Sequence, residues 1–124
     1  AVMYDLSGLP AGGTAWVRDD WRMLCNRMNI TQDPAYLKHK GRPVVSVWGV
    51  GFNDRNKPRK YSLAECRKLI EFLKQDGCTV MLGVATGWRE QKRDAVSDPE
   101  LHEVLRIADI ISPWTPGRYR DLKC

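Results

Sequence analysis

The chain has 124 residues, of which 43% are hydrophobic and 28% charged, and its formal net charge is +5. A chain of this length forms one domain with its own core, and it has no apolar run near the roughly 20 residues that cross a bilayer, so no membrane span is expected. The densest basic run, 55–60, has no interleaved aromatic residues, so we read it as a solvated loop and expect no nucleic-acid partner.

The first predicted element is a short apolar strand at 1–4, which a cluster of Gly and Pro residues closes. A helix follows, because four apolar residues recur at a spacing that places them on one helical face. These residues are Val17, Trp21, Leu24 and Met28.

Asp33-Pro34 has the form of an N-cap followed by proline at the first helical position. It predicts a short extra helix from Ala35 to Lys40, which Gly41 ends. The second strand is then Val44 to Trp48, a nearly continuous apolar run of the kind found when both faces of a parallel sheet are covered.

The clearest helix boundaries lie around the next element. Ser62 and Glu65 form a capping box, and Gly77 supplies a left-handed C-terminal stop. The apolar residues between them have helical spacing, so a helix is predicted from Ser62 to Gly77. Residues 78–85 (CTVMLGVA) follow as the third strand.

Asp98-Pro99 repeats the cap and proline pair, and the apolar stripe from Leu101 to Ala108 predicts the last helix. Asp109 to Ser112 is the fourth strand. We expect no two-residue hairpin turn, so every crossover contains a helix and the strands are parallel. The predicted fold class is therefore α/β, with residues 1–124 forming one unit of parallel βα repeats that amounts to half of a TIM (β/α)8 barrel.

The alternative architecture is an open, doubly wound sheet that binds a dinucleotide. That fold places a glycine fingerprint directly after its first strand. Gly8, Gly12 and Gly13 are too far apart for this pattern, and Gly49-Val50-Gly51 has no third glycine or nearby helix start. No dinucleotide cofactor is expected.

Aromatic and polar residues gather where the predicted strands end, which is where parallel α/β proteins bind ligands. A sugar ring buries its C–H face on an aromatic plane and gives its hydroxyls to charged or amide groups. An oligosaccharide or polysaccharide is therefore the expected ligand, although a single Trp at such a place can instead cap the core. The strand-end residues are Asp5, Trp48, Thr86, Trp88, Arg89, Glu90 and Trp114.

Asp5 is the best carboxylate candidate for catalysis, and Glu90 is a much weaker one. Asp5 can instead bond the Ser7 or Gly8 amide of its own turn, and Glu90 and Asp94 lie among charged loop residues that are usually solvated. Glycosidic hydrolysis generally needs two carboxyl groups on opposite sides of the bond. We therefore expect little or no turnover by this chain alone.

The spacing of the four cysteines contains no CxxC pair, so free thiols are expected. The only two histidines are His39 in a basic stretch and His102 on a helix. No metal site and no cofactor are predicted.

Four segments of the chain resemble bacterial glycoside hydrolases related to families 71 and 99, some of which are described as xylosidase/arabinosidase-like. The resemblance runs over essentially the whole chain, and its KGRPVV and ISPWTPGRY motifs are fairly specific. One departure is Ala85, which stands where the pattern has proline. The segments are MYDLSGL (3–9), YLKHKGRPVVSVWG (36–49), VMLGVATGWRE (80–90) and ADIISPWTPGRY (108–119).

The resemblance implies a TIM barrel that acts on a polysaccharide or glycan, with its principal catalytic glutamates in a later segment. It adds Arg118 to the residues near the active-site face, and we include Tyr119 of the same motif among the substrate-binding candidates. Because Val2 to Tyr4 already reads as strand with no signal peptide before it, we expect a piece of a longer protein, and the parent is expected to be secreted or periplasmic.

Three functional hypotheses follow. The first is a fragment of a glycoside hydrolase barrel that contributes part of a carbohydrate cleft and is completed by the missing half of the barrel. The second is a half-barrel that associates with a second copy, since four parallel strands leave two open edges. The third is a non-enzymatic module that binds a carbohydrate or uses its basic loop to bind an acidic partner.

Overall fold

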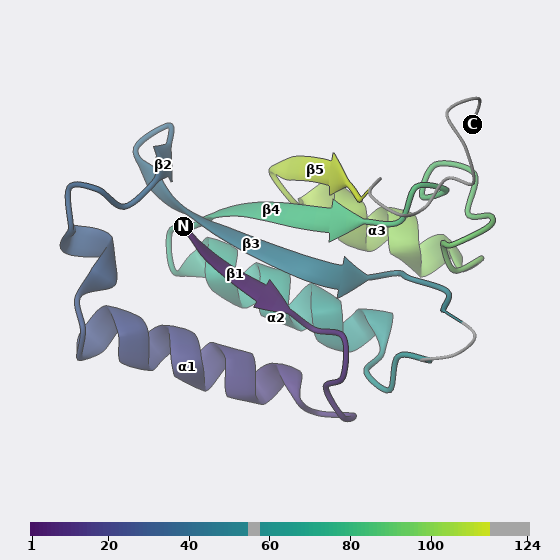
Figure 1. The fold of residues 1–124 in the computed structure, drawn as a ribbon, viewed down its shortest axis with the longest axis horizontal. Helices are drawn as coiled ribbons and strands as arrows, with labels where there is room; N and C mark the ends of the chain where they lie inside the picture. Colours follow the sequence, from purple (N-terminus) through teal and green to yellow (C-terminus); the bar gives the residue numbers. More distant parts are fainter. Residues whose placement is uncertain (55–57, 115–124) are drawn as a thin grey trace.

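Four parallel strands form the centre of the protein, for which a computed structural model describes residues 1–54 and 58–114 (Figure 1). Neighbouring strands in the sheet are also consecutive parallel strands along the chain. A fifth, two-residue strand, β2, pairs antiparallel with the beginning of β3. The parallel strands are β1 (Val2–Asp5), β3 (Arg42–Val50), β4 (Thr79–Val84) and β5 (Ile110–Pro113), and β2 is Lys38–His39.

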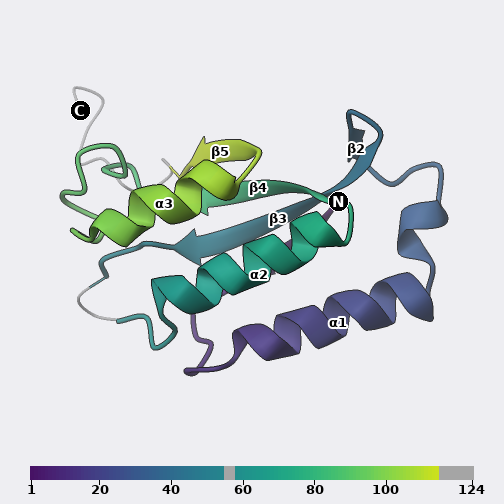
Figure 2. The ribbon, with the colours of Figure 1, turned by 180° about the vertical axis from the view of Figure 1, so that it is seen from behind.

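A helix lies in each crossover between parallel strands, and all three helices cover the same face of the sheet (Figure 2). When each new strand joins the same edge of the growing sheet, right-handed crossovers place every helix on the same face. The predicted α/β class with a parallel sheet is thus confirmed. The helices are α1 (Thr14–Asn26), α2 (Leu63–Gln75) and α3 (Pro99–Ile107), and a short 3-10 helix, η1 (Ile30–Gln32), follows α1.

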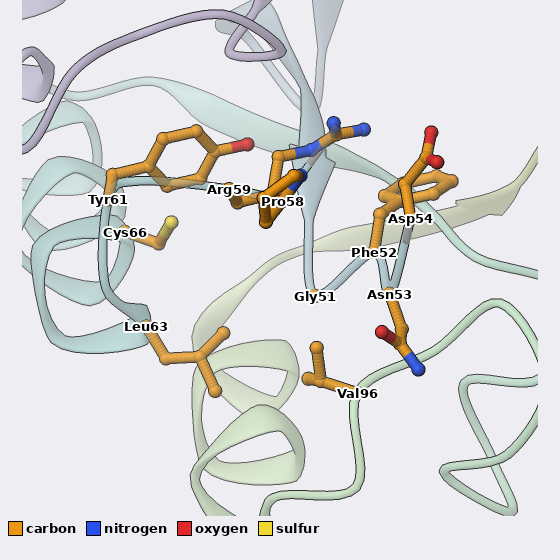
Figure 3. A pocket seen from close by; sticks show the side chains of 10 residues that line it. All are labelled: Gly51, Phe52, Asn53, Asp54, Pro58, Arg59, Tyr61, Leu63, Cys66 and Val96. Carbon is orange, nitrogen blue, oxygen red and sulfur yellow. The ribbon is translucent and has the colours of Figure 1, made fainter. Parts of the chain in front are cut away.

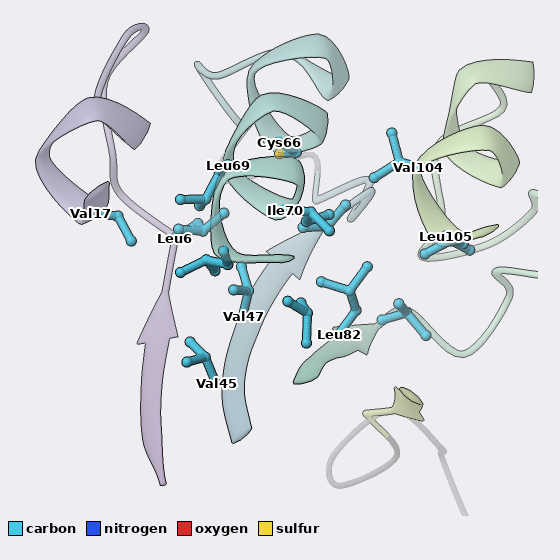
Figure 4. Close-up of a cluster of buried hydrophobic side chains, with 14 of the residues drawn as sticks. Leu6, Val17, Val45, Val47, Cys66, Leu69, Ile70, Leu82, Val104 and Leu105 are labelled. Atoms are coloured by element: carbon cyan, nitrogen blue, oxygen red, sulfur yellow. The ribbon is translucent and has the colours of Figure 1, made fainter. Parts of the chain in front are cut away.

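The core lies between the sheet and these helices (Figure 4). Val47 on β3 and Leu82 on β4 are adjacent in register and fully buried beneath α2, which contributes Leu69 and Ile70. The opposite face of the sheet carries no helix in the described part of the chain. On that face the side chain of Met3 is 65% exposed.

The predicted caps of α2 and α3 are present. The Ser62 hydroxyl accepts a hydrogen bond from the Glu65 amide at 3.1 Å, and Gly77 follows the helix with φ +88°. The Asp98 carboxylate accepts from the Glu100 amide at 2.9 Å. The capping box at α2 is only half formed, because the Glu65 carboxylate accepts a 3.0 Å bond from Gly12 and so ties the loop before α1 to α2.

The predicted helix at 35–40 is wrong, and so is the expectation that the chain has no two-residue hairpin. Lys40 and Gly41 have φ of +52° and +78°, the geometry of a tight turn, and they join β2 to β3. Asp33 does bond the Ala35 amide at 2.8 Å, but it closes a local turn and starts no helix. Tyr36 packs against the core, but Leu37 is 56% exposed, so the segment has no apolar stripe at helical spacing.

The helical stripe that begins at Val17 is shorter than predicted. Val17 and Trp21 are buried, but α1 ends at Asn26 and Met28 lies exposed beyond it. The chain leaves the helical conformation at Asn29, whose φ is +51°.

None of the helices within 1–54 and 58–114 combines the length and apolarity needed to cross a membrane.

Candidate functional site

Two of the predicted strand-end tryptophans meet at the C-terminal ends of the parallel strands. Trp48 lies near the end of β3, and Trp114 directly follows β5. Their ring centroids are 5.8 Å apart at an interplanar angle of 74°, an edge-to-face arrangement. The amide of Trp114 donates to the carbonyl oxygen of Val84 at 2.8 Å, which anchors this residue against the end of β4.

Phe52 and Arg59 complete what we call the aromatic cluster, defined as Trp48, Phe52, Arg59 and Trp114. The ring centroids of Trp48 and Phe52 are 4.6 Å apart. The guanidinium carbon of Arg59 lies 5.8 Å from the Trp48 centroid and 5.7 Å from that of Phe52, within cation–π range. The indole Nε1 of Trp48 is buried and has no hydrogen-bond partner among the described residues.

Gly83 makes room for this arrangement. It is the registered neighbour of Trp48 on β4, and a Cβ atom at this position would overlap the Trp48 Cδ1 atom. A strand glycine often marks such a close approach. The indole therefore lies across β4 and reaches toward Trp114, which directly follows β5.

Asp5, the last residue of β1, also lies at this end of the sheet. It is the registered neighbour of Trp48, on the side of β3 away from β4. Its side chain is exposed, and Oδ1 accepts a 2.9 Å bond from the Ser7 amide. Asp5 therefore does bond the Ser7 amide of its own turn, which is the structural alternative to a catalytic role. Within the described residues, Ser7 is the only hydrogen-bond partner of this carboxylate.

A cavity of about 300 Å³ opens beside the aromatic cluster (Figure 3). Phe52 and Arg59 belong to both. The wall of the cavity combines apolar surface from Leu63 and Val96 with the carboxylate of Asp54 and the amide of Asn53. These groups can accept and donate hydrogen bonds to hydroxyl groups.

Tyr61 forms another wall of this cavity and is fixed in place. Its hydroxyl donates to the Gly49 carbonyl at 2.6 Å. Burial raises the pKa of Tyr61 above its usual range, so the phenol stays protonated and keeps donating. A second hollow of about 260 Å³, lined by 7–9 and 58–60, shares Arg59 with the first.

Trp88 and Arg89 do not reach the aromatic cluster. They line a separate hollow of about 390 Å³ with His102, Leu105 and Ile111, on the helix side of β5. The Arg89 guanidinium carbon lies 5.1 Å from the Trp88 ring centroid. The structure therefore does not bring Trp88 together with the other two strand-end tryptophans.

Asp94 explains where the loop after β4 goes. Its carboxylate accepts bonds from the Thr86 amide (3.0 Å), the Thr86 hydroxyl (2.9 Å) and the Gly87 amide (2.9 Å). Burial acts to raise the pKa of Asp94, but the bonds from Gly87 and Thr86 outweigh it, and the net pKa is lowered. The expectation that Asp94 is solvated is therefore wrong. The Thr86 hydroxyl, a predicted substrate-binding group, instead donates its hydrogen bond to Asp94.

The remaining candidates are placed as follows. Glu90 is exposed, and no contact among the described residues joins it to Asp5. Arg118 and Tyr119 lie outside the described residues, as do residues 55–57 of the basic run. Within 1–54 and 58–114, no group of three or more His, Cys, Asp or Glu side chains is arranged to hold a metal ion. Cys25, Cys66 and Cys78 are free thiols, as predicted.

Six residues of the site were not predicted from the sequence: Phe52, Asn53, Asp54, Arg59, Tyr61 and Gly83. The strand before Phe52 was ended at Trp48, whereas β3 continues to Val50. Gly83 carried a usable signal, because a glycine inside a buried strand often accommodates a large neighbour. Arg59 gave no such signal, since its stacking depends on two rings brought together by the fold.

The chain matches no protein-family model, no curated protein and no solved structure in comparisons with known proteins. The aromatic cluster and the cavity beside it are therefore the grounds for a functional assignment.

Proposed function

We propose that this chain is half of a (β/α)8 barrel of the glycoside hydrolase kind, and that its aromatic cluster forms part of a carbohydrate-binding cleft. The strand order supports the barrel. Neighbours in the sheet are consecutive parallel strands, and all three helices lie on one face. A doubly wound sheet has helices on both faces and reverses its strand order, so this arrangement favours a barrel sector.

The observation that carries the sugar proposal is the edge-to-face pair of Trp48 and Trp114 at the strand ends, with a polar-walled cavity beside it. Trp114 is 43% exposed and offers an apolar plane to a sugar face. Asn53, Asp54 and Arg59 line the adjoining cavity, and their polar groups are of the kinds that form hydrogen bonds with sugar hydroxyls. The ligand class that fits is an oligosaccharide or polysaccharide.

Binding and hydrolysis make different demands on this site. Hydrolysis needs two carboxyl groups roughly 5–10 Å apart across the bond. Asp5 is one candidate at the strand ends, but Glu90 is not brought to it. We therefore assign this chain a share of substrate binding, with the catalytic carboxylates supplied by the remainder of a longer parent.

A glycan array, followed by tryptophan fluorescence titration with plant and mannose-type oligosaccharides, tests the proposal. We expect saturable binding of at least one oligosaccharide class and negligible turnover. Flat titrations across the whole panel would remove the carbohydrate assignment.

A second candidate, association with another copy, is favoured by the edges of the sheet. Among the described strands, none pairs with the outer edge of β1 or of β5. Uncovered edges are templates for further pairing, and the exposed Met3 lies on the face that carries no helix. Sedimentation at several concentrations decides this candidate, because a monomer that persists at the highest concentration contradicts it.

A further inference from the structure

Four basic residues are concentrated at the end of the sheet opposite the aromatic cluster. Lys38, His39, Lys40 and Arg42 belong to the hairpin that joins β2 to β3, and all four are exposed. The sequence has no Asp or Glu from Pro34 to Asn53. The hairpin projects beyond the N-terminal ends of the parallel strands (Figure 1).

The backbone holds these side chains on a defined frame. His39 and Arg42 are cross-strand partners, so their side chains lie on the same face of the hairpin. The Leu37 carbonyl accepts a 3.0 Å bond from the Val44 amide, which extends the pairing. The buried Thr79 hydroxyl donates to the His39 carbonyl at 3.2 Å and attaches the hairpin to β4.

A hollow of about 360 Å³ lies under this hairpin, lined by His39, Lys40, Arg42, Thr79 and Asp109. Asp109 is already matched, because its carboxylate lies 3.4 Å from the Lys74 ammonium and accepts a 3.0 Å bond from the Val80 amide. The basic side chains of the hairpin form no ion pair with any residue in the described ranges. The ammonium of Lys40 and the guanidinium of Arg42 therefore line the hollow without an ion-pair partner among the described residues, and the one carboxylate there already pairs with Lys74.

We propose that this hollow, the hairpin site, binds a compact oxyanion: a sulfate or phosphate group, either free or carried as an ester on a larger molecule. A guanidinium fork with an ammonium group suits the several oxygens of such an anion. No Phe, Tyr or Trp lines the hollow, and the imidazole of His39 is its one aromatic ring, so the lining suits an isolated anionic group better than a stacked nucleobase. This proposal does not depend on the sugar cleft, which lies at the other end of β3.

Calorimetric titration of the whole chain with sodium sulfate, sodium phosphate and a sulfated disaccharide tests the proposal, with ionic strength held constant by chloride. We expect saturable binding of at least one of the three below about 10 mM. Tighter binding of the disaccharide than of free sulfate identifies an ester as the ligand, and equal binding identifies the free ion. No saturable binding by any of the three would overturn the proposal.

The matched variants separate a site from general charge. Lys40→Asn with Arg42→Gln removes two charges, and Asn tolerates the left-handed conformation of residue 40. We expect at least tenfold weaker binding. Lys60→Gln with Lys68→Gln removes the same charge from exposed positions elsewhere and should change affinity less than twofold. An equal loss of affinity in both double variants means that no site exists.

Should the first double variant unfold the hairpin, Arg42→Lys is the alternative. It keeps the charge but removes the guanidinium fork, and unchanged affinity in that variant contradicts the proposal.

Discussion

The indole of Trp48 lies so close to Gly83 on the neighbouring strand that this position has no room for a Cβ atom. Gly83→Ala should therefore push the indole away from Trp114. We expect a loss of about 1–3 kcal/mol in the free energy of unfolding, which is the usual cost of overpacking. Urea denaturation measures this loss, and the tryptophan emission should change in the folded state.

A double-mutant cycle attributes the cost to the indole. In a Trp48→Ala background the methyl group that Gly83→Ala adds has space, so the added cost of this substitution should fall close to zero. If the cost is the same in both backgrounds, the contact with Trp48 is not its cause.

Asp94 should stabilise the loop after β4 in a way that depends on pH. Its pKa is lowered from 3.8 in the folded chain, so its contribution is present above the unfolded value and is lost as the pH falls through the lower, folded value. Asp94→Asn should cost about 1–2 kcal/mol near pH 7, because an amide replaces the charged acceptor of three bonds. The cost should shrink in acid.

Denaturation of both proteins between neutral and acid pH measures this difference. Glu90→Gln, an exposed carboxylate of the same loop, is the matched control and should leave stability nearly unchanged. An Asp94→Asn cost that stays constant with pH would mean that ionisation of Asp94 does not contribute.

The buried thiols should resist chemical modification. Burial raises the pKa of Cys66 and of Cys78 to about 12, and the thiolate is the reactive form. In a Cys124→Ser variant at pH 8, a thiol reagent should label the partly exposed Cys25 well before either of them. Mass spectrometry of the labelled peptides gives the order, and equal rates at all three positions under native conditions would contradict the burial.

The parts of the fold that follow from local chemistry were predictable. Ser62 and Gly77 mark α2, and Asp98-Pro99 marks α3, because a cap bonds residues only two or three positions away. The parallel sheet followed from the alternation of strands and helices. The caps join neighbouring residues, and the parallel pairing follows because a crossover that contains a helix returns the chain to the same end of the sheet.

The errors share a different cause. Lys40 takes a left-handed conformation that Lys seldom adopts, and the pairing of β2 with β3 imposes it. Trp88 sits at a strand end like Trp48, yet the bonds from Thr86 and Gly87 to Asp94 turn its loop toward α3. These outcomes depend on contacts across the loop and the sheet, which spacing along the chain does not encode.

Trp114 tests the central claim with little risk to the fold, because its side chain is 43% exposed. Trp16 is a matched control, since it is 62% exposed and lies on α1, away from the aromatic cluster. The direct measurement is a calorimetric titration of the native chain and both variants with xylose-, arabinose- and mannose-type oligosaccharides. We predict that Trp114→Ala weakens binding at least tenfold and that Trp16→Ala leaves it unchanged. Equal affinity in all three proteins, or no binding by the native chain, would contradict a sugar cleft at these strand ends.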